Sequence, residues 1–355
     1  MRRIIRALGT GLLLCGLTSG LPAAAAESLS VAEVKQVLAQ AIQEAQARGA
    51  PASIAVVDRV GNALALYTMS GANTQFDGSA SDCPSGCVKI TSGDASKGGL
   101  EGTFVPGRVA ALAKAVTGAY LSSRGNAFTT RTASQIIQDH FNPRERFAPS
   151  GPLFGVQLSQ LPCSDLVITT NSAAVTVGPK RSPLGLAGDP GGIPLYKNNE
   201  PVGAIGVISD GIYSVDLNVG DVDSDNDELI AVAGTVGFEA PVDIRGNRIT
   251  VEGKTFRFTD RGTESLRSTP SAAPSFDSLS ASVGSLLTLN TYSDGTIRSG
   301  TAFGDAASGY RQDTSGVFGN LDAFVLVDTA NQARFAPKAG TEGTADALTA
   351  VEVQA

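Results

Sequence analysis

The chain has 355 residues, which is enough for one large domain or for two smaller ones. Hydrophobic residues make up 42% of it and charged residues 17%, so we expect a substantial buried core. The formal net charge of −7 argues against a nucleic-acid-binding protein, because phosphate contacts depend on clustered Lys and Arg side chains.

Residues 1–26 are predicted to be an export signal. Three arginines near the start are followed by an apolar stretch from Leu8 to Leu21 and by the small residues Ala24 to Ala26, which suit a signal peptidase. The apolar stretch is shorter than the ~20 residues that a membrane span needs. We therefore expect cleavage near Ala26 and a periplasmic or secreted mature chain without a membrane span. Removal of the three arginines takes the formal charge from −7 to −10.

A helix and a pair of strands are predicted to open the mature chain. Ser30 and Glu33 have the spacing of a capping box, in which each side chain accepts a hydrogen bond from the backbone of the other. Apolar residues then recur at helical spacing, at Val34, Val37, Leu38, Ala41, Ile42 and Ala45. We expect strands over 53–58 and 63–69, joined by a short turn. Residues 71–107 are rich in Gly, Ser, Asp and Pro and are predicted to form a long loop.

Two further helices, a strand hairpin and another helix are predicted next. Apolar residues at helical spacing indicate helices over 108–123 and 131–141. Residues 142–190 are again rich in loop-forming residues. The stretch 191–211 has a hairpin pattern, and 225–238 is predicted to be a helix whose first residue is a good N-cap.

The remainder of the chain is predicted to be a connector. Residues 261–346 are rich in Ser, Gly and Ala and carry some β pattern. The final stretch, 347–355, repeats the first helix start, because Thr349 and Glu352 again have capping-box spacing. We therefore expect that the chain is a fragment that ends as a second copy of its first domain begins. The alternative is a chance match over a short overlap.

Three stretches of the sequence resemble the GlcG/HbpS family of haem-binding proteins. They are 29–72, 111–137, and the pair formed by 191–211 with 225–234; the third contains a GG-x-P strand followed by GAIGV and an acidic helix start. The resemblance implies an α/β (α+β) sandwich, in which an antiparallel sheet is packed by helices. It also implies a domain over 27–260, with insertions near 71–107 and 142–190.

The function that this resemblance implies is that of an exported protein for reversible haem binding, storage or sensing, with haem as its cofactor. Family members often self-associate, so we expect a homo-oligomer. The resemblance also implies a binding module more strongly than a catalyst, so we expect no catalytic activity. One alternative is a non-catalytic accessory or interaction subunit of a metabolic enzyme. The other is an enzyme acting on a small metabolite, for which Cys163 and His140 could form a thiol–imidazole pair.

Five residues are candidates for holding haem. His140 is the only histidine, and it could bind the iron or, alternatively, interact with the carbonyl groups at a helix end. Lys114, Arg131 and Thr132 match family positions. Lys114 or Arg131 could pair with a haem propionate, the alternative being a structural salt bridge or a helix cap. Met69 is a weaker candidate ligand, with core packing as its alternative.

Two further features of the sequence have open interpretations. Cys83 and Cys87 could close the CPSGC loop as a disulfide in an oxidising compartment, or Cys83-Pro84 could bind haem through the thiolate. The run from Asp221 to Asp227 could bind calcium, since alternating carboxylates can converge on a hard cation. Val232 stands where the twelfth, bidentate position of an EF-hand would need Glu, so a solvated acidic loop is the alternative.

Overall fold

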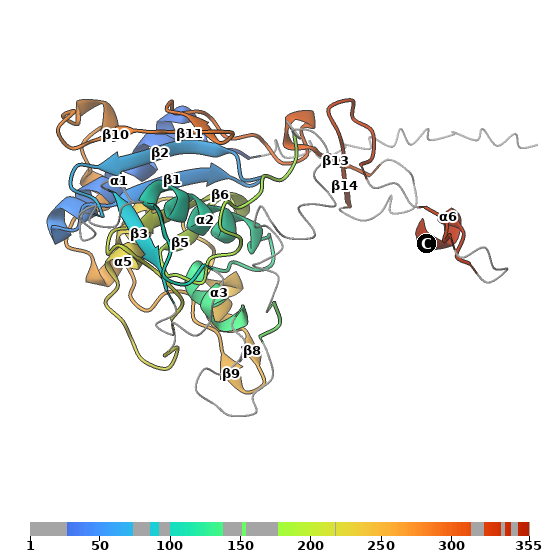
Figure 1. The fold of residues 1–355 in the computed structure, drawn as a ribbon, viewed down its shortest axis with the longest axis horizontal. Coiled ribbons are helices and arrows are strands. Elements are labelled where there is room, and N and C mark those ends of the chain that lie inside the picture. Colours follow the sequence, from blue (N-terminus) through green and yellow to red (C-terminus); the bar gives the residue numbers. More distant parts are fainter. Residues whose placement is uncertain are drawn as a thin grey trace, which may run out of the picture.

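The computed structural model describes residues 27–73, 86–91, 100–137, 151–153, 177–216, 218–313, 323–334, 338–341 and 347–354. Within these ranges, the centre of the molecule is an antiparallel sheet with helices on both faces (Figure 1). The predicted α/β sandwich, an antiparallel sheet packed by helices, is confirmed.

Five strands form the central sheet, in the order β10-β2-β1-β6-β5, and every neighbouring pair is antiparallel. They are β1 (Ser53–Asp58), β2 (Ala63–Met69), β5 (Gly192–Lys197), β6 (Glu200–Ile208) and β10 (Gly284–Leu286). Both predicted hairpins are present. The turn between β5 and β6 contains Asn198 and Asn199 at φ 49° and 65°, the left-handed conformation that asparagine tolerates well.

Helices cover both faces of this sheet because its strands are apolar on both sides. α1 (Val31–Arg48) and α5 (Asn226–Gly234) share one core with Ile54 and Val56. α2 (Gly107–Tyr120) shares the other core with residues of the opposite parity, such as Ala55. This is the alternation expected of a strand, in which successive side chains point to opposite faces.

The helix starts follow their capping signals. Ser30 and Glu33 form the predicted capping box of α1, in which the Ser30 N–H donates to Glu33 Oε2 at 2.7 Å. Thr349 and Glu352 form the same box at the start of α6 (Ala350–Gln354). The helix predicted over 131–141 is present as α3 (Thr130–Ile136), and residues 138–141 lie outside the described part of the chain.

Glycines let α2 lie directly against the sheet. A Cβ added at Gly206 would collide with the Ala111 carbonyl, and one at Gly192 would collide with the Lys114 carbonyl. These glycines belong to the GG-x-P and GAIGV motifs. The physical reason for the motifs is therefore close packing of a helix backbone on two strands.

The long loop predicted over 71–107 contains two strands, so this part of the prediction was wrong. A three-stranded sheet forms in the order β4-β3-β7, from β3 (Cys87–Ile90), β4 (Phe104–Pro106) and β7 (Ile212–Tyr213). Local sequence could not show this, because β3 pairs in parallel with a strand that is distant along the chain. The remaining pairs are β8 (Thr250–Val251) with β9 (Lys254–Thr255), β11 (Thr288–Leu289) with β12 (Ser293–Asp294), and β13 (Tyr310–Gln312) with β14 (Phe324–Leu326).

Part of the predicted connector packs on the central sheet. β10 extends the sheet beyond β2, with Gly284 opposite Met69. The backbone N–H of Thr301 donates to the Asp58 carboxylate at 3.0 Å, which fixes this segment to the turn between β1 and β2. The predicted domain boundary near residue 260 stays a prediction. None of the helices in the described part of the chain is both long and apolar enough to cross a membrane.

Candidate functional site

Lys114 lies at the centre of a buried ionic cluster beneath α2. Its ammonium donates to the carbonyls of Pro190 and Val207 at 2.7 and 2.8 Å and to the Asp227 carboxylate at 2.7 Å, and it lies 2.6 Å from Asp189. The side chain is completely buried. Burial alone would lower the pKa of Lys114, but the carboxylates of Asp189 and Asp227 outweigh it and raise this pKa. With four oxygens around three N–H groups, Lys114 has no donor left for a ligand.

Arg131 is the centre of a second cluster, which joins α3 to α5. Its Nε lies 2.6 Å from Glu228, and its Nη1 lies 3.0 Å from Asp216, 2.9 Å from Asp260 and 3.3 Å from Asp223. The guanidinium is only 1% exposed. In this structure Arg131 therefore pairs with the protein's own carboxylates, and a haem propionate would have to displace them.

Thr132 and Met69 also have structural partners. Thr132 forms a capping box with Thr129 at the start of α3, and its hydroxyl donates to the Arg257 carbonyl at 2.6 Å. Met69 is buried in the core beside α1, where its sulfur accepts the Ala52 N–H at 3.5 Å. These are the alternatives that the sequence left open, and the roles of both residues in haem binding stay predictions.

The remaining candidate residues lie partly outside the described part of the chain. His140, Cys83 and Cys163 fall in ranges that the structure does not describe. Cys87, at the start of β3, is disulfide-bonded. Its predicted pairing with Cys83 stays a prediction.

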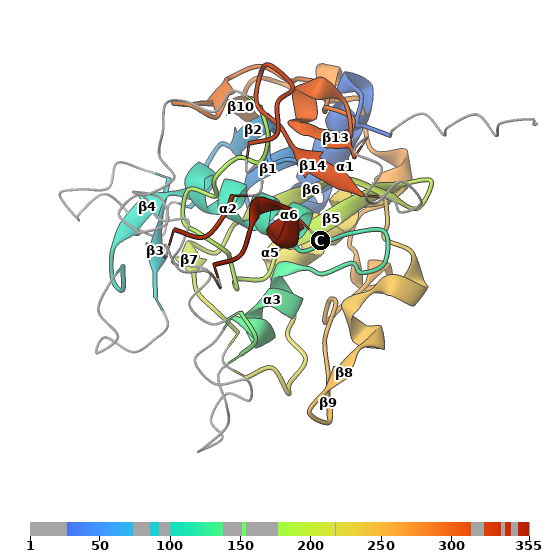
Figure 2. The ribbon, with the colours of Figure 1, turned by 90° about the vertical axis from the view of Figure 1, so that its right-hand side faces the viewer.

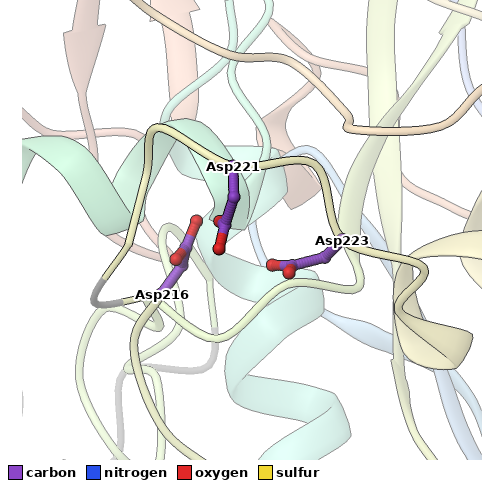
Figure 3. A group of neighbouring side chains, drawn as sticks. All are labelled: Asp216, Asp221 and Asp223. Carbon is purple, nitrogen blue, oxygen red and sulfur yellow. The ribbon is translucent and has the colours of Figure 1, made fainter.

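An acidic pocket of about 280 Å³ adjoins both cationic clusters. Six aspartates line it: Asp189, Asp210, Asp216, Asp221, Asp223 and Asp225. Carboxylate oxygens of Asp216, Asp221 and Asp223 lie within 4.8 Å of one another, so these three side chains could hold a metal ion (Figure 3). Arg131 Nη1 already contacts two of them and supplies positive charge there.

The acidic run from 221 to 227 is divided among different structural roles. Asp225 caps α5 by accepting hydrogen bonds from the N–H groups of Asp227 and Glu228 at 2.7 and 3.1 Å. Asp227 pairs with Lys114, and Asp223 pairs with Arg131. Asp221 and Asp225 contact neither cation among the described contacts. The calcium interpretation of this run stays a prediction.

The acidic pocket makes the stability of the protein depend on pH. Burial first, and then the charge of Asp227, raises the pKa of Asp225 to about 7 and that of Asp210 to about 6. Because the folded state holds these protons more tightly than the unfolded chain, stability falls as the pH rises from about 4 to above 7. We expect a higher melting temperature at pH 5 than at pH 8.

Asp225→Asn tests this expectation, because asparagine also caps helices well but carries no titratable proton. This variant should reduce the difference in melting temperature between pH 5 and pH 8. Asp243→Asn, at an exposed aspartate, serves as the matched control and should keep the difference. An unchanged difference in Asp225→Asn would contradict the assignment of the pH dependence to this carboxyl group.

A second pocket, of about 350 Å³, is lined by residues from the turn between β1 and β2, the end of α2 and the start of β13. Figure 2 shows the ribbon of these elements. Its walls include Arg59, Tyr120, Phe303 and Tyr310. The Arg59 guanidinium carbon lies 3.7 Å from the centre of the Phe303 ring. Sequence analysis did not single out Arg59, because residue 59 belongs to a short turn and the aromatic residues beside it lie far along the chain.

Comparison with known proteins finds a family resemblance near the start of the chain. Residues 29–82 match the family model described as "Haem degrading protein HbpS-like". This segment is therefore similar to that family. The resemblance stated from the sequence is thereby confirmed for this segment. A search of curated proteins found no match.

Two solved structures are similar to part of the chain. One is described as a PduOC:heme complex, with 14% identity, a TM-score of 0.33, and coverage of 60% of this chain and 96% of that one. The other is Klebsiella pneumoniae protein ORFY, of the family model DUF336, with 18% identity, a TM-score of 0.31, and coverage of 61% and 94%.

The matched segment carries α1, β1 and β2 and therefore two of the five strands of the central sheet. Arg59 lies in it, at the turn between the two strands, and Met69 lies at the end of β2. The clusters around Lys114 and Arg131 lie outside this matched segment.

Proposed function

We propose that this protein is exported and binds haem reversibly, for storage or sensing. The observation that carries the proposal is the match of residues 29–82 to a family of haem-related proteins. Export of the chain and His140 as the iron ligand are proposed from the sequence patterns, and self-association is proposed from the family resemblance. Haem supplies the iron chemistry when it is bound, and an imidazole is a common protein ligand of haem iron.

Titration of the purified protein with haemin tests this proposal. We expect a saturable shift of the Soret band, and we expect His140→Ala to abolish it or move its position. Met69→Leu, which conserves volume, tests the weaker candidate ligand in the same way. A shift that survives in His140→Ala would assign the iron to another ligand. If the Soret band shows no saturable shift at all, the haem proposal is wrong.

The matched family is described as haem degrading, which favours a second candidate function, namely turnover of the bound haem. The same titration separates the two candidates when it is followed over time with a reductant or hydrogen peroxide present. Bleaching of the Soret band that depends on folded protein would indicate turnover. A stable Soret band under the same conditions would indicate binding alone.

A further inference from the structure

We infer that the pocket beside Arg59 binds a carboxylate attached to a planar, unsaturated ligand. The inference starts from the guanidinium of Arg59, which is half-buried yet has no hydrogen bond and no ion pair within the described part of the chain. Its one described contact is with the face of the Phe303 ring, at 3.7 Å. Burying part of a cation without an anion is energetically unfavourable. An anionic ligand that paired with Arg59 would therefore be stabilised at this point.

The carboxylates nearest to Arg59 are already engaged. Asp58 accepts hydrogen bonds from the N–H groups of Val60, Asn62 and Thr301 at 3.1, 2.9 and 3.0 Å. Glu200 pairs with Arg124 at 2.5 Å. Burial lowers the pKa of Arg59, and the charge of Glu200 only partly offsets this. Because both carboxylates are engaged, we expect the anion that pairs with Arg59 to come from a ligand.

The other walls of the pocket determine the shape of that ligand. Phe303 packs on Tyr310 at 4.6 Å between ring centres and on Phe324 at 4.9 Å, which gives a continuous aromatic wall. Val60 and Pro179 add apolar surface. The Tyr310 hydroxyl has no hydrogen-bond partner among the described residues, so it can donate to a ligand oxygen. Such a site suits a flat, apolar body with an oxyanion at one edge.

Both walls are held in place by the protein before any ligand binds. The Asp58 carboxylate accepts hydrogen bonds from the turn that carries Arg59 and also from Thr301, two residues before Phe303. On the α2 side, the Tyr120 hydroxyl donates to the Val60 carbonyl at 3.0 Å and also to the Lys180 carbonyl. This fixed geometry lowers the cost of ordering the site on binding.

The charge of the lining favours a carboxylate over a phosphate. Arg59 is the only cationic side chain among the eight residues that line the pocket, all of which lie in the described part of the chain. One planar guanidinium matches one carboxylate in a two-point pair. A volume of about 350 Å³ is near the lower end for ligand pockets, so it holds a small aromatic acid or one edge of a larger ring system.

Two ligand classes share this chemistry. One is a porphyrin that places a propionate on Arg59, and this source rests on the proposed haem function. The other is a small aromatic acid, which is independent of it. Three probes distinguish them, namely haemin, 2-naphthoate, and 2-naphthamide, which has the shape of the acid without its charge.

The test measures binding of the three probes to the full chain and to Arg59→Gln, Arg59→Lys and Arg298→Gln. Arg298, which is 56% exposed and paired with Asp294, provides the matched control. We expect wild type to bind the carboxylate probe about tenfold more tightly than Arg59→Gln, which corresponds to about 1.4 kcal/mol. Arg59→Lys should retain part of the preference, and Arg298→Gln all of it. Melting temperatures of the variants establish that each one is folded.

The outcomes separate this inference from the haem proposal. Tenfold weaker haemin binding in Arg59→Gln, without binding of naphthoate, supports the inference with a porphyrin as the source. A preference for naphthoate over naphthamide that Arg59→Gln removes supports it with a small acid, even if haemin does not bind. Equal binding of haemin to wild type and Arg59→Gln, with no preference for naphthoate, overturns the inference and leaves the haem proposal standing. Failure of every probe to bind overturns both.

Discussion

Lys114→Met is expected to lower the free energy of unfolding by about 3–5 kcal/mol, because it leaves buried carboxylates without their cation. Asp227 is 2% exposed and Asp189 is 7% exposed, so water cannot replace the ammonium. For a domain of this size, we expect a fall in melting temperature of about 10 °C. Thermal unfolding followed by circular dichroism, together with urea titration, measures both quantities.

A matched control and a rescue make the result of Lys114→Met specific. Lys35→Met removes an ion pair with Asp277 on the surface, where the two side chains are 32% and 65% exposed. Such a pair contributes at most about 1 kcal/mol. Adding Asp227→Asn to Lys114→Met removes one stranded charge and should restore part of the stability. A loss below about 1 kcal/mol in Lys114→Met would contradict the buried ion-pair account.

Arg131→Met is the second change with a large expected effect, about 4 kcal/mol. It removes the cation that Glu228 and Asp216 share, and these side chains are 1% and 7% exposed. Asp260 also loses a partner, although Arg257 remains 2.7 Å from it. Chemical denaturation at pH 7.5 measures the loss, and the midpoint should shift without a change in slope if the folded state stays compact.

Arg131→Lys tests whether the shape of the guanidinium is needed in addition to its charge. A guanidinium reaches several carboxylates from one plane, whereas an ammonium is a point charge on a flexible chain. We expect Arg131→Lys to recover only part of the loss. Arg298→Met, at an exposed pair with Asp294, is the control and should cost less than about 1 kcal/mol. Full recovery in Arg131→Lys would show that charge alone is sufficient.

These two clusters change the interpretation of residues that were first noticed by their family resemblance. Lys114 and Arg131 were candidates for propionate pairing, with structural salt bridges as the alternative. The described structure places both in salt bridges, on either side of one acidic pocket. Their expected effect is therefore on stability, and a haem titration of their variants is interpretable only where the variants remain folded. Arg59, which the sequence did not single out, has a guanidinium that contacts the Phe303 ring and has no ion pair among the described residues.

Local sequence determined those features that depend on neighbouring residues. The capping boxes at Ser30 and Thr349, the N-cap at Asp225, and the hairpin between β1 and β2 each need only a few adjacent side chains with the right spacing. The helices and the β5–β6 hairpin follow from apolar periodicity and turn residues in the same way, whereas the antiparallel sandwich as a whole was implied by the family resemblance. These elements appear in the structure where the sequence predicted them.

Tertiary structure alone decided the features that join distant parts of the chain. β3 pairs with β7, β10 extends the sheet beside β2, and Phe303 meets Arg59, and none of these contacts leaves a local pattern. The same holds for the charges. The sequence does not show whether a charged side chain is solvated or buried against a partner. Only packing therefore determines which charges are compensated. Arg59 is an example, because its contact with Phe303 forms only when the β1–β2 turn and a segment distant in sequence pack together.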